Sequence, residues 1–230
     1  MTAKASTKRE PLTRQRVLEA AVDLADRDGI EAVTMRKLGQ ELGVEAMSLY
    51  NHVKNKEDVL DGAIEVIVAE IADEVATADI DTTTWKTTVR GRIMAARSIM
   101  LRHPWAPAVI ETRTKMTPTL IAYFDGLLGE LLEGGFSYDL AHHAMHALGS
   151  RALGFTQELF EPDGEPDADE VSTSQLLEMK DVFPNLVGML DAISHDPNED
   201  SLGWCDDQTE FTFGIDLLLD GLEARLRSHR

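Results

Sequence analysis

The chain has 230 residues, 43% of them hydrophobic, which is ample for a core and fits one large domain or two small ones. Its single cysteine, Cys205, excludes an intrachain disulfide and a paired-cysteine metal site and favours a reducing compartment. The net charge of −19 argues against a general affinity for nucleic acid. The chain shows neither a run of the ~18 apolar residues that a membrane span needs nor the apolar core of a signal peptide, so we expect a cytoplasmic protein.

The N-terminal region is predicted to be a basic arm followed by an amphipathic helix. Residues 1–11 are polar and are expected to be disordered. From about Thr13 to Arg27 apolar residues recur at helical spacing, and Asp28-Gly29 ends the helix.

The segment Thr34–Lys56 has the pattern of a helix-turn-helix. Thr34 is a good N-cap, and Leu38 and Leu42 share one helical face. Gly43 follows, where a helix ends in the left-handed conformation. A short second helix over residues 46–51 then turns small and polar residues outward. In such a motif the second helix can enter the major groove of DNA.

Charge is distributed unevenly between this region and the rest of the chain. Residues 1–56 hold ten Lys and Arg against eight Asp and Glu, a net charge of +2. The remaining residues hold 12 against 33, a net charge of −21. A negative body repels phosphate, so it would direct the small N-terminal face toward DNA. Solubility alone explains the acidity equally well.

Four longer helices are predicted over residues 55–160. Asn55 caps the first, which carries an apolar stripe as far as Val75 and is followed by the polar break 79–84. The second runs from Trp85 to residue 103, before a region that Pro104 and Pro107 interrupt. The third opens at Thr117-Pro118 and stops at 134–135, and the fourth is capped by Ser137 and extends to about residue 160.

The C-terminal third combines an acidic loop with further helices. Glu161–Glu170 holds six acidic residues, two prolines and a glycine, and we expect a mobile loop there. Helices are predicted over about 173–182, 184–194 and 206–227. No segment alternates as a strand does, so the predicted fold class is all-α, with about nine or ten helices.

The segment Thr13–Leu60 resembles the tetracycline-repressor (TetR) family of transcriptional regulators. The matching features are an alanine-rich first helix followed by Gly29, the leucines before Gly43-Val44, and the pattern Leu-Tyr-x-His-Val-x-Asn-Lys over residues 49–56. The rest of the chain is similar to the tetracycline-repressor-like C-terminal domain through Arg102–Pro107, Leu131–Ser137 and the helical layout.

The resemblance implies a ligand-responsive repressor that binds a palindromic operator as a homodimer and is released by a small molecule. It divides the chain into an arm and three-helix DNA-binding head over 1–56 and, over 57–230, a linker helix with a larger helical bundle for ligand binding and dimerisation. Two recognition helices must lie one DNA turn apart, about 34–36 Å, so a small pivot of the linker helix would break register. No catalytic residue, cofactor or metal is expected. The alternative is a small-molecule or metal-binding enzyme on a helical bundle.

Eight residues are candidates for DNA contact. Arg36 and Lys37 open the first helix of the motif and can meet phosphates or a base edge. Ala46, Met47 and Ser48 open the second helix and can read bases. Tyr50, His52 and Lys56 can donate hydrogen bonds to phosphate. Close relatives can carry glutamine at the position of Ala46, so readout here would depend on thymine methyls, Met47 or DNA shape. The alternatives are a solvated helix face for Arg36 and Lys37 and packing for Tyr50 and His52.

Six residues are candidates for lining a ligand pocket, although the same residue types at helical spacing are also typical of a core. They are Met100, His103, Trp105, Tyr123, Phe124 and His146. His142 and His146 are four apart, a spacing that can hold zinc, but no Glu-x-x-His or cysteine accompanies them. We therefore expect His142, His143 and His146 to be polar surface residues at a pocket or subunit interface.

Two helices are candidates for the subunit interface. The helix over 138–160 is rich in Ala and Gly, which allows close helix approach, and the last helix has a broad apolar face. Two such helices from each subunit would form a four-helix bundle. The alternative is that both faces are buried within one subunit.

Overall fold

The computed structural model describes residues 11–113, 116–154, 179–193 and 207–228, and these residues form helices and no strand, which confirms the all-α prediction. In chain order the elements are α1 Arg14–Asp28, η1 Ile30–Ala32, α2 Met35–Leu42, α3 Ala46–Leu49, α4 Lys56–Thr77, α5 Trp85–Arg102, α6 Ala106–Thr112, α7 Pro118–Glu133, α8 Tyr138–Gly154, α10 Pro184–Ile193 and α11 Asp207–Ser228.

Several predicted segments lie partly or wholly outside the described residues. These are the N-terminal arm over 1–10, the end of the helix predicted to reach residue 160, the acidic segment 161–170, and most of the helix predicted over 173–182. Residues 179–182 form a turn. No helix of the described part of the chain has the length and apolar character needed to cross a membrane.

The helix starts follow the predicted capping residues. The Thr34 hydroxyl accepts a hydrogen bond from the backbone N–H of Lys37 at 3.2 Å, and the Asn55 side chain accepts one from that of Asp58 at 2.9 Å. Thr117 and Ser137 cap α7 and α8 in the same way. Because each cap satisfies a backbone donor that the helix itself cannot, these starts are determined locally.

The corner between α2 and α3 depends on two glycines. Gly43 ends α2 with φ of 64°, a left-handed conformation that side chains with a Cβ adopt at a cost. A Cβ added to Gly39 would lie 2.9 Å from the Val44 carbonyl oxygen, so α2 and the start of α3 can approach this closely only without one. The two helices of the motif are therefore held at close range.

Two elements differ from the sequence predictions. α3 spans four residues, two fewer than predicted, because the chain passes into turns after Leu49. α6 forms in the region that the prolines were expected only to interrupt. Pro107 lies in the first turn of α6, where its missing N–H leaves no hydrogen bond unmade.

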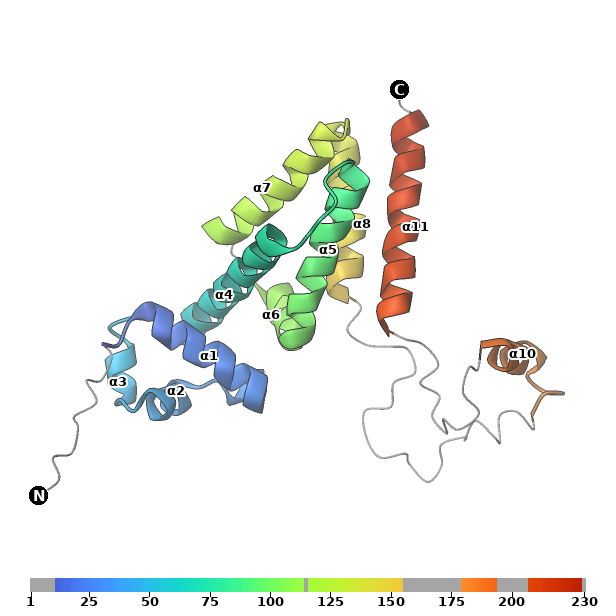
Figure 1. Ribbon diagram of the computed structural model, residues 1–230. Helices are drawn as coiled ribbons and strands as arrows, with labels where there is room; N and C mark the ends of the chain where they lie inside the picture. The colour runs from blue at the N-terminus through green and yellow to red at the C-terminus, as the bar shows by residue number, and fades with distance from the viewer. Residues whose placement is uncertain (1–10, 114–115, 155–178, 194–206, 229–230) are drawn as a thin grey trace, which may run out of the picture.

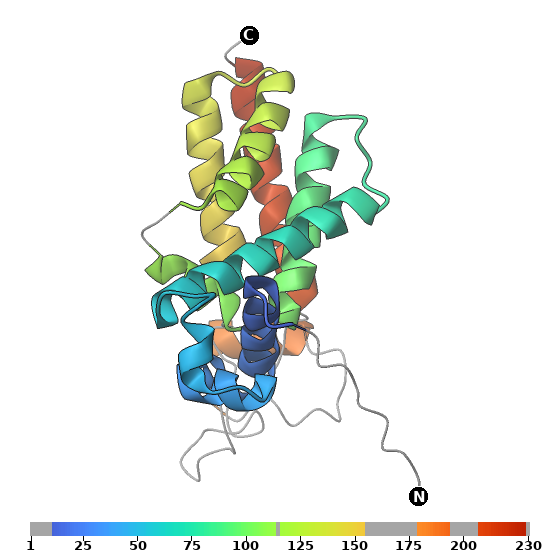
Figure 2. The same cartoon turned by 90° about the vertical axis from the view of Figure 1, so that its left-hand side faces the viewer.

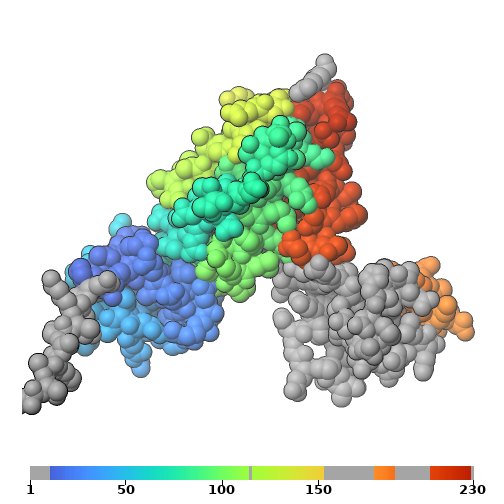
Figure 3. All heavy atoms as spheres, viewed as in Figure 1, coloured from blue at the N-terminus to red at the C-terminus, as the bar shows by residue number. Residues whose placement is uncertain are grey.

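The elements form a head and a bundle joined by α4. α1, η1, α2 and α3 lie together at one end, and α4 runs from them obliquely across one side of a bundle of α5, α7, α8 and α11 (Figures 1 and 2). The space-filling view shows the head as a lobe at one end of the molecule and α11 along the opposite flank (Figure 3).

The buried side chains form two clusters, and one of them crosses from the head into the bundle. The first contains the apolar faces of α1, α2 and α3 together with α4, the last turns of α5, and α6. The second joins α5, α7, α8 and α11. Because the first cluster includes Met100, Trp105 and Val109, the head packs directly against the segment that follows α5.

Candidate DNA-binding surface and effector cavity

The short helix α3 is anchored by one buried side chain and presents the others outward. Leu49 is fully buried, whereas Met47 is 75% exposed and Tyr50, which follows the helix, is 47% exposed. Ala46 and Ser48 are half-buried. The base-reading candidates thus sit on a helix whose position is determined by core packing, and Met47 extends furthest into solvent.

The other DNA-contact candidates lie at the beginnings of α2 and α4. Arg36 and Lys37 are exposed in the first turn of α2, and the Lys37 ammonium lies 3.6 Å from the carboxylate of Asp28. Lys56 is the first residue of α4, and His52 is half-buried in the turns between α3 and α4. All eight candidates belong to the head or to its junction with α4.

An ion pair outside the predicted set holds this junction in place. The Arg14 guanidinium donates to both carboxylate oxygens of Asp58 at 3.0 Å, and the backbone N–H of Lys54 donates to the same carboxylate at 2.7 Å. Burial alone would raise the pKa of the Asp58 carboxyl, but the hydrogen bonds from Arg14 and Lys54 and their positive charges lower it. Asp58 therefore fastens the first turn of α4, which carries Lys56, to the first turn of α1.

A mainly apolar cavity of about 90 Å³ lies between α4, α5, α6, α7 and α8. Three of the predicted pocket residues, Met100, Tyr123 and Phe124, line it together with aliphatic side chains such as those of Val68 and Leu127. Burial raises the pKa of the Tyr123 phenol. The phenol therefore stays protonated near neutral pH and can act as a hydrogen-bond donor.

Sequence reasoning missed Arg97, a basic residue in the lining of this cavity. Arg97 is 5% exposed, its Nε donates to the side-chain oxygen of Gln208 at 3.3 Å, and its guanidinium lies 4.0 Å from the ring centroid of Phe211. A charged residue on the apolar face of α5 was the available signal. Since guanidinium groups are almost always charged, Arg97 places a positive charge at the wall of the cavity.

A larger hollow of about 700 Å³ adjoins this cavity on the side of α8. His146, the fourth predicted pocket residue, lines it with His142, Glu111 and Ser150. The ring centroids of His142 and His146 are 4.6 Å apart. Among the described residues no group of three or more His, Cys, Asp or Glu side chains is arranged to hold a metal ion.

The last two predicted pocket residues, His103 and Trp105, line neither space. His103 Nδ1 lies 2.8 Å from an oxygen of Asp26 in α1, and Nε2 lies 3.2 Å from an oxygen of Glu70 in α4. The Trp105 indole N–H donates to Asp26 at 2.6 Å. Both ring nitrogens of His103 thus face carboxylates, one from the head and one from α4. These two residues therefore tie the end of α5 to the head.

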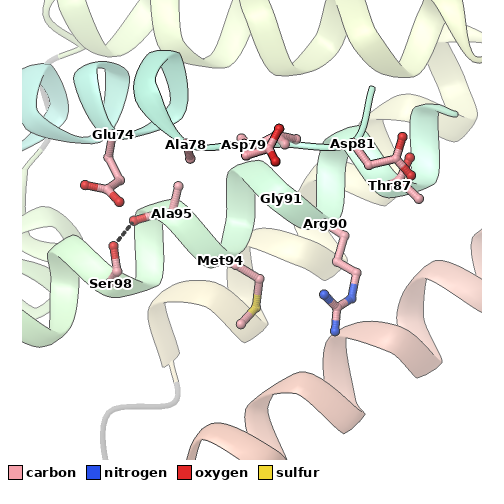
Figure 4. Close-up of a pocket in the computed structure, with 11 residues that line it drawn as sticks. Glu74, Ala78, Asp79, Asp81, Thr87, Arg90, Gly91, Met94, Ala95 and Ser98 are labelled. Carbon is pink, nitrogen blue, oxygen red and sulfur yellow. Dashed lines mark hydrogen bonds between the residues drawn. The ribbon is translucent and has the colours of Figure 1, made fainter. Parts of the chain in front are cut away.

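A further hollow of about 430 Å³ lies at the far end of α4 (Figure 4). Its rim carries Glu74, Asp79 and Asp81, and Arg90 on the same rim is paired with Asp216 of α11 at 2.6 Å. Ser98 donates to the carbonyl of Ala95 within the same helix. The carboxylates give this hollow the wrong charge for phosphate, so it does not extend the DNA-binding surface.

The helices predicted for the subunit interface are partly buried within one chain. Ala141 and Ala144 of α8 pack into the second core cluster with Phe211 and Ile215 of α11. Other apolar side chains of α11 remain outside, and Phe213 is 61% and Leu217 56% exposed. Burial within one subunit thus accounts for one face of each helix, and the described residues leave a second apolar face of α11 exposed.

Comparison with known proteins gives matches over most of the chain. Residues 78–226 match the tetracyclin repressor-like C-terminal domain, and residues 17–63 match the bacterial regulatory proteins of the tetR family. An HTH-type transcriptional regulator of Saccharopolyspora erythraea is 35% identical over 125 residues, 54% of this chain and about half, 51%, of that protein. The class A tetracycline repressor protein from transposon 1721 of Escherichia coli is 30% identical over 220 residues, 95% of this chain and 93% of that protein. The crystal structure of Streptomyces coelicolor ActR in complex with (S)-DNPA aligns with a TM-score of 0.71 at 26% identity, covering 93% of this chain and 98% of that one.

Proposed function

The chain belongs to the TetR family of bacterial regulatory proteins, and on this premise we propose which of its residues bind DNA, hold the effector and couple the two. It is a ligand-responsive DNA-binding transcriptional repressor and not an enzyme. Its partners are operator DNA, a second copy of itself and a small-molecule effector.

The proposed DNA contacts are the eight candidates at α2, α3 and the start of α4. The exposure of Met47 and Tyr50 around the completely buried Leu49 is the observation that carries this assignment. Arg36, Lys37, Tyr50, His52 and Lys56 contact phosphates, which sets affinity and its salt dependence. Ala46, Met47 and Ser48 face base edges, where apolar contact with thymine methyls is the available direct readout.

The proposed effector site is the mainly apolar cavity between α4, α5, α6, α7 and α8. Met100, Tyr123 and Phe124 line it, and a cavity with mainly apolar walls and few polar groups is typical of small-molecule sites. His146 belongs to the adjoining hollow. We reassign His103 and Trp105 from lining the pocket to coupling, because their polar atoms are bonded to the head.

Two contacts are proposed to carry the effector signal to the head. Ile110 of α6 lines the cavity, and Arg113, which follows α6, donates to Glu57 at 2.6 Å and to Asp61 at 3.3 Å in the first turns of α4. His103 and Trp105 hold Asp26 of α1. A ligand that displaces α6 therefore moves Arg113, and with it the start of α4 that carries Lys56, which changes the separation of the two heads in a dimer.

The uncovered face of α11 is proposed to form the subunit interface together with α8. Phe213 and Leu217 would become buried there, and a second copy related by two-fold symmetry would present the same face. We also propose the division into residues 1–56 and 57–230, because α4 begins at Lys56 and leads away from the head. A repressor that binds the bacterial chromosome works in the cytoplasm, which is the proposed location.

Operator binding tests these assignments directly. Fluorescence anisotropy with labelled fragments of the DNA flanking the protein's own gene should show tight binding that weakens linearly in a plot of log K against log salt. Lys180→Ala, which removes an exposed lysine far from the head in sequence, is the matched control for each head variant. The absence of binding to any such fragment at low salt would contradict the proposal.

A further inference from the structure

Gly149 lies in the interior of α8 with open space beside it in its own subunit. Among the described residues, a Cβ added at this position would meet nothing within 4 Å. Glycine in a helix interior is less favourable than alanine, so α8 is less stable than it would be with alanine here. The absent side chain leaves open space at this point of the helix.

That open space borders both the inner cavity and the outer hollow. Gly149, Phe124 and Met145 line the two spaces, so they form a common wall. The inner space is mainly apolar and has Arg97 as a charged lining residue, whereas the outer one carries Glu111, His142 and His146. The two spaces therefore differ in polarity and meet at Gly149.

The inner cavity alone is too small for a drug-sized effector. Its volume of about 90 Å³ is below the roughly 150 Å³ of a cavity that holds one benzene, and drug-sized ligands occupy about 300–1,000 Å³. The outer hollow has the missing volume, at about 700 Å³. Met145 can clear the way between them, because its unbranched side chain has three rotatable bonds.

We propose that the two spaces are one elongated effector site, open across Gly149, and that its occupant is a flat aromatic anion whose acidic group reaches Arg97. This inference rests on the proposed effector site and adds the class of ligand. The aromatic body would lie between Phe124 and Met145. The acidic group would accept hydrogen bonds from the buried guanidinium of Arg97.

Two fluorescent probes of one skeleton test the charge requirement. 8-Anilinonaphthalene-1-sulfonate is an aromatic anion, and N-phenyl-1-naphthylamine is the same ring system without the sulfonate. The full-length protein should bind one sulfonate probe per protomer, about tenfold or more tighter than the neutral probe. Arg97→Gln should remove this preference and Arg97→Lys should retain it. Equal affinity of the unmodified protein for both probes, or no binding of the anion, overturns the ligand class.

Two glycine variants test the opening. Gly149→Leu fills the shared space and should weaken the sulfonate probe about tenfold, whereas Gly129→Leu on α7, where a Cβ also meets nothing within 4 Å, should leave its affinity within about twofold. Light scattering shows whether each variant remains a dimer. If Gly149→Leu disturbs the dimer, Met145→Trp narrows the same opening from a second residue. Equal probe affinity in the blocking variant and the Gly129→Leu control overturns the proposal.

Operator binding separates this inference from the proposed function. If the protein binds its operator but the Arg97 and Gly149 variants bind the probes as the unmodified protein does, the proposed repressor function stands and the proposal of one elongated effector site fails. A protein that binds the anionic probe as described but no operator fragment contradicts the proposed function instead.

Discussion

Replacing Asp26 with alanine should remove the contact that ties the head to the end of α5. The Asp26 carboxylate accepts from the Trp105 indole at 2.6 Å and faces His103 Nδ1 at 2.8 Å. Trp105 and His103 are each 7% exposed, so both side chains have little contact with bulk water. Asp26→Ala therefore leaves a buried indole donor unpaired and takes from His103 one of its two carboxylates.

The expected cost follows from these two bonds. A hydrogen bond to a charged group contributes about 1.5–3 kcal/mol, and a buried donor left unpaired costs about 1–3 kcal/mol. The Asp26 side chain is itself 29% exposed, which lowers both values because water already competes for the carboxylate. We expect the free energy of unfolding to fall by about 2–4 kcal/mol. With an m-value of about 2 kcal/mol/M, the urea midpoint falls by about 1–2 M.

The assay is urea unfolding followed by circular dichroism at one fixed protomer concentration, because the stability of a dimer depends on concentration. Asp23→Ala, which removes an exposed carboxylate from the same helix, is the matched control and should change stability by less than about 0.5 kcal/mol. Asp26→Asn keeps an acceptor for Trp105 and should fall between the two. If Asp26→Ala is no less stable than Asp23→Ala, the contact does not hold the head, and the coupling assigned to it is wrong.

Three further predictions concern the DNA-binding surface. Lys56→Ala should weaken operator binding for all sequences and lower the slope of log K against log salt by about one unit, whereas Lys180→Ala should leave the slope unchanged in the same anisotropy assay. Met47→Ala should leave the free energy of unfolding within about 0.5 kcal/mol, since the side chain is 75% exposed, but should lose about 1–3 kcal/mol of discrimination at one or two operator positions, measured on a set of operator variants. Asp58→Asn tests the lowered pKa of Asp58: a carboxyl with a lower pKa in the folded state than its usual 3.8 stabilises the fold above that value and loses this contribution as the pH falls through the folded-state pKa. The stability difference between the unmodified protein and Asp58→Asn should thus be constant above about pH 5 and shrink below about pH 4, and a difference independent of pH would count against the Arg14–Asp58 assignment.

Local signals in the sequence predicted the helical layout and the head. The caps at Thr34, Asn55 and Thr117 and the left-handed Gly43 all depend on residues three or four positions apart. The apolar stripes of α1, α4 and α5 likewise repeat within a few residues. α6 escaped prediction because Pro107 breaks a helix in most positions but is harmless in the first turn, and its position in the turn depends on where the helix begins.

The effector site was predictable only in part. Met100, Tyr123 and Phe124 line the cavity, as their residue types and spacing suggested, although whether they bind the effector stays a prediction. Arg97 was missed because a single arginine in an apolar stripe usually extends its charge to solvent. Here α11 covers it, with Phe211 beneath its guanidinium and Gln208 accepting from its Nε.

The amino-acid sequence by itself determined the helical class, the helix-turn-helix head and the chemical types available for phosphate contact, because capping, periodicity and turn geometry act within one or two helical turns. Only the tertiary structure decided that His103 and Trp105 bond to Asp26, which lies 77 positions before His103 and 79 positions before Trp105 in the chain. Only the tertiary structure, likewise, brings the inner cavity and the outer hollow together at Gly149. Such contacts depend on how α1, α4, α5 and α8 pack against one another, and packing is settled by the combined shape of many side chains rather than by any local pattern.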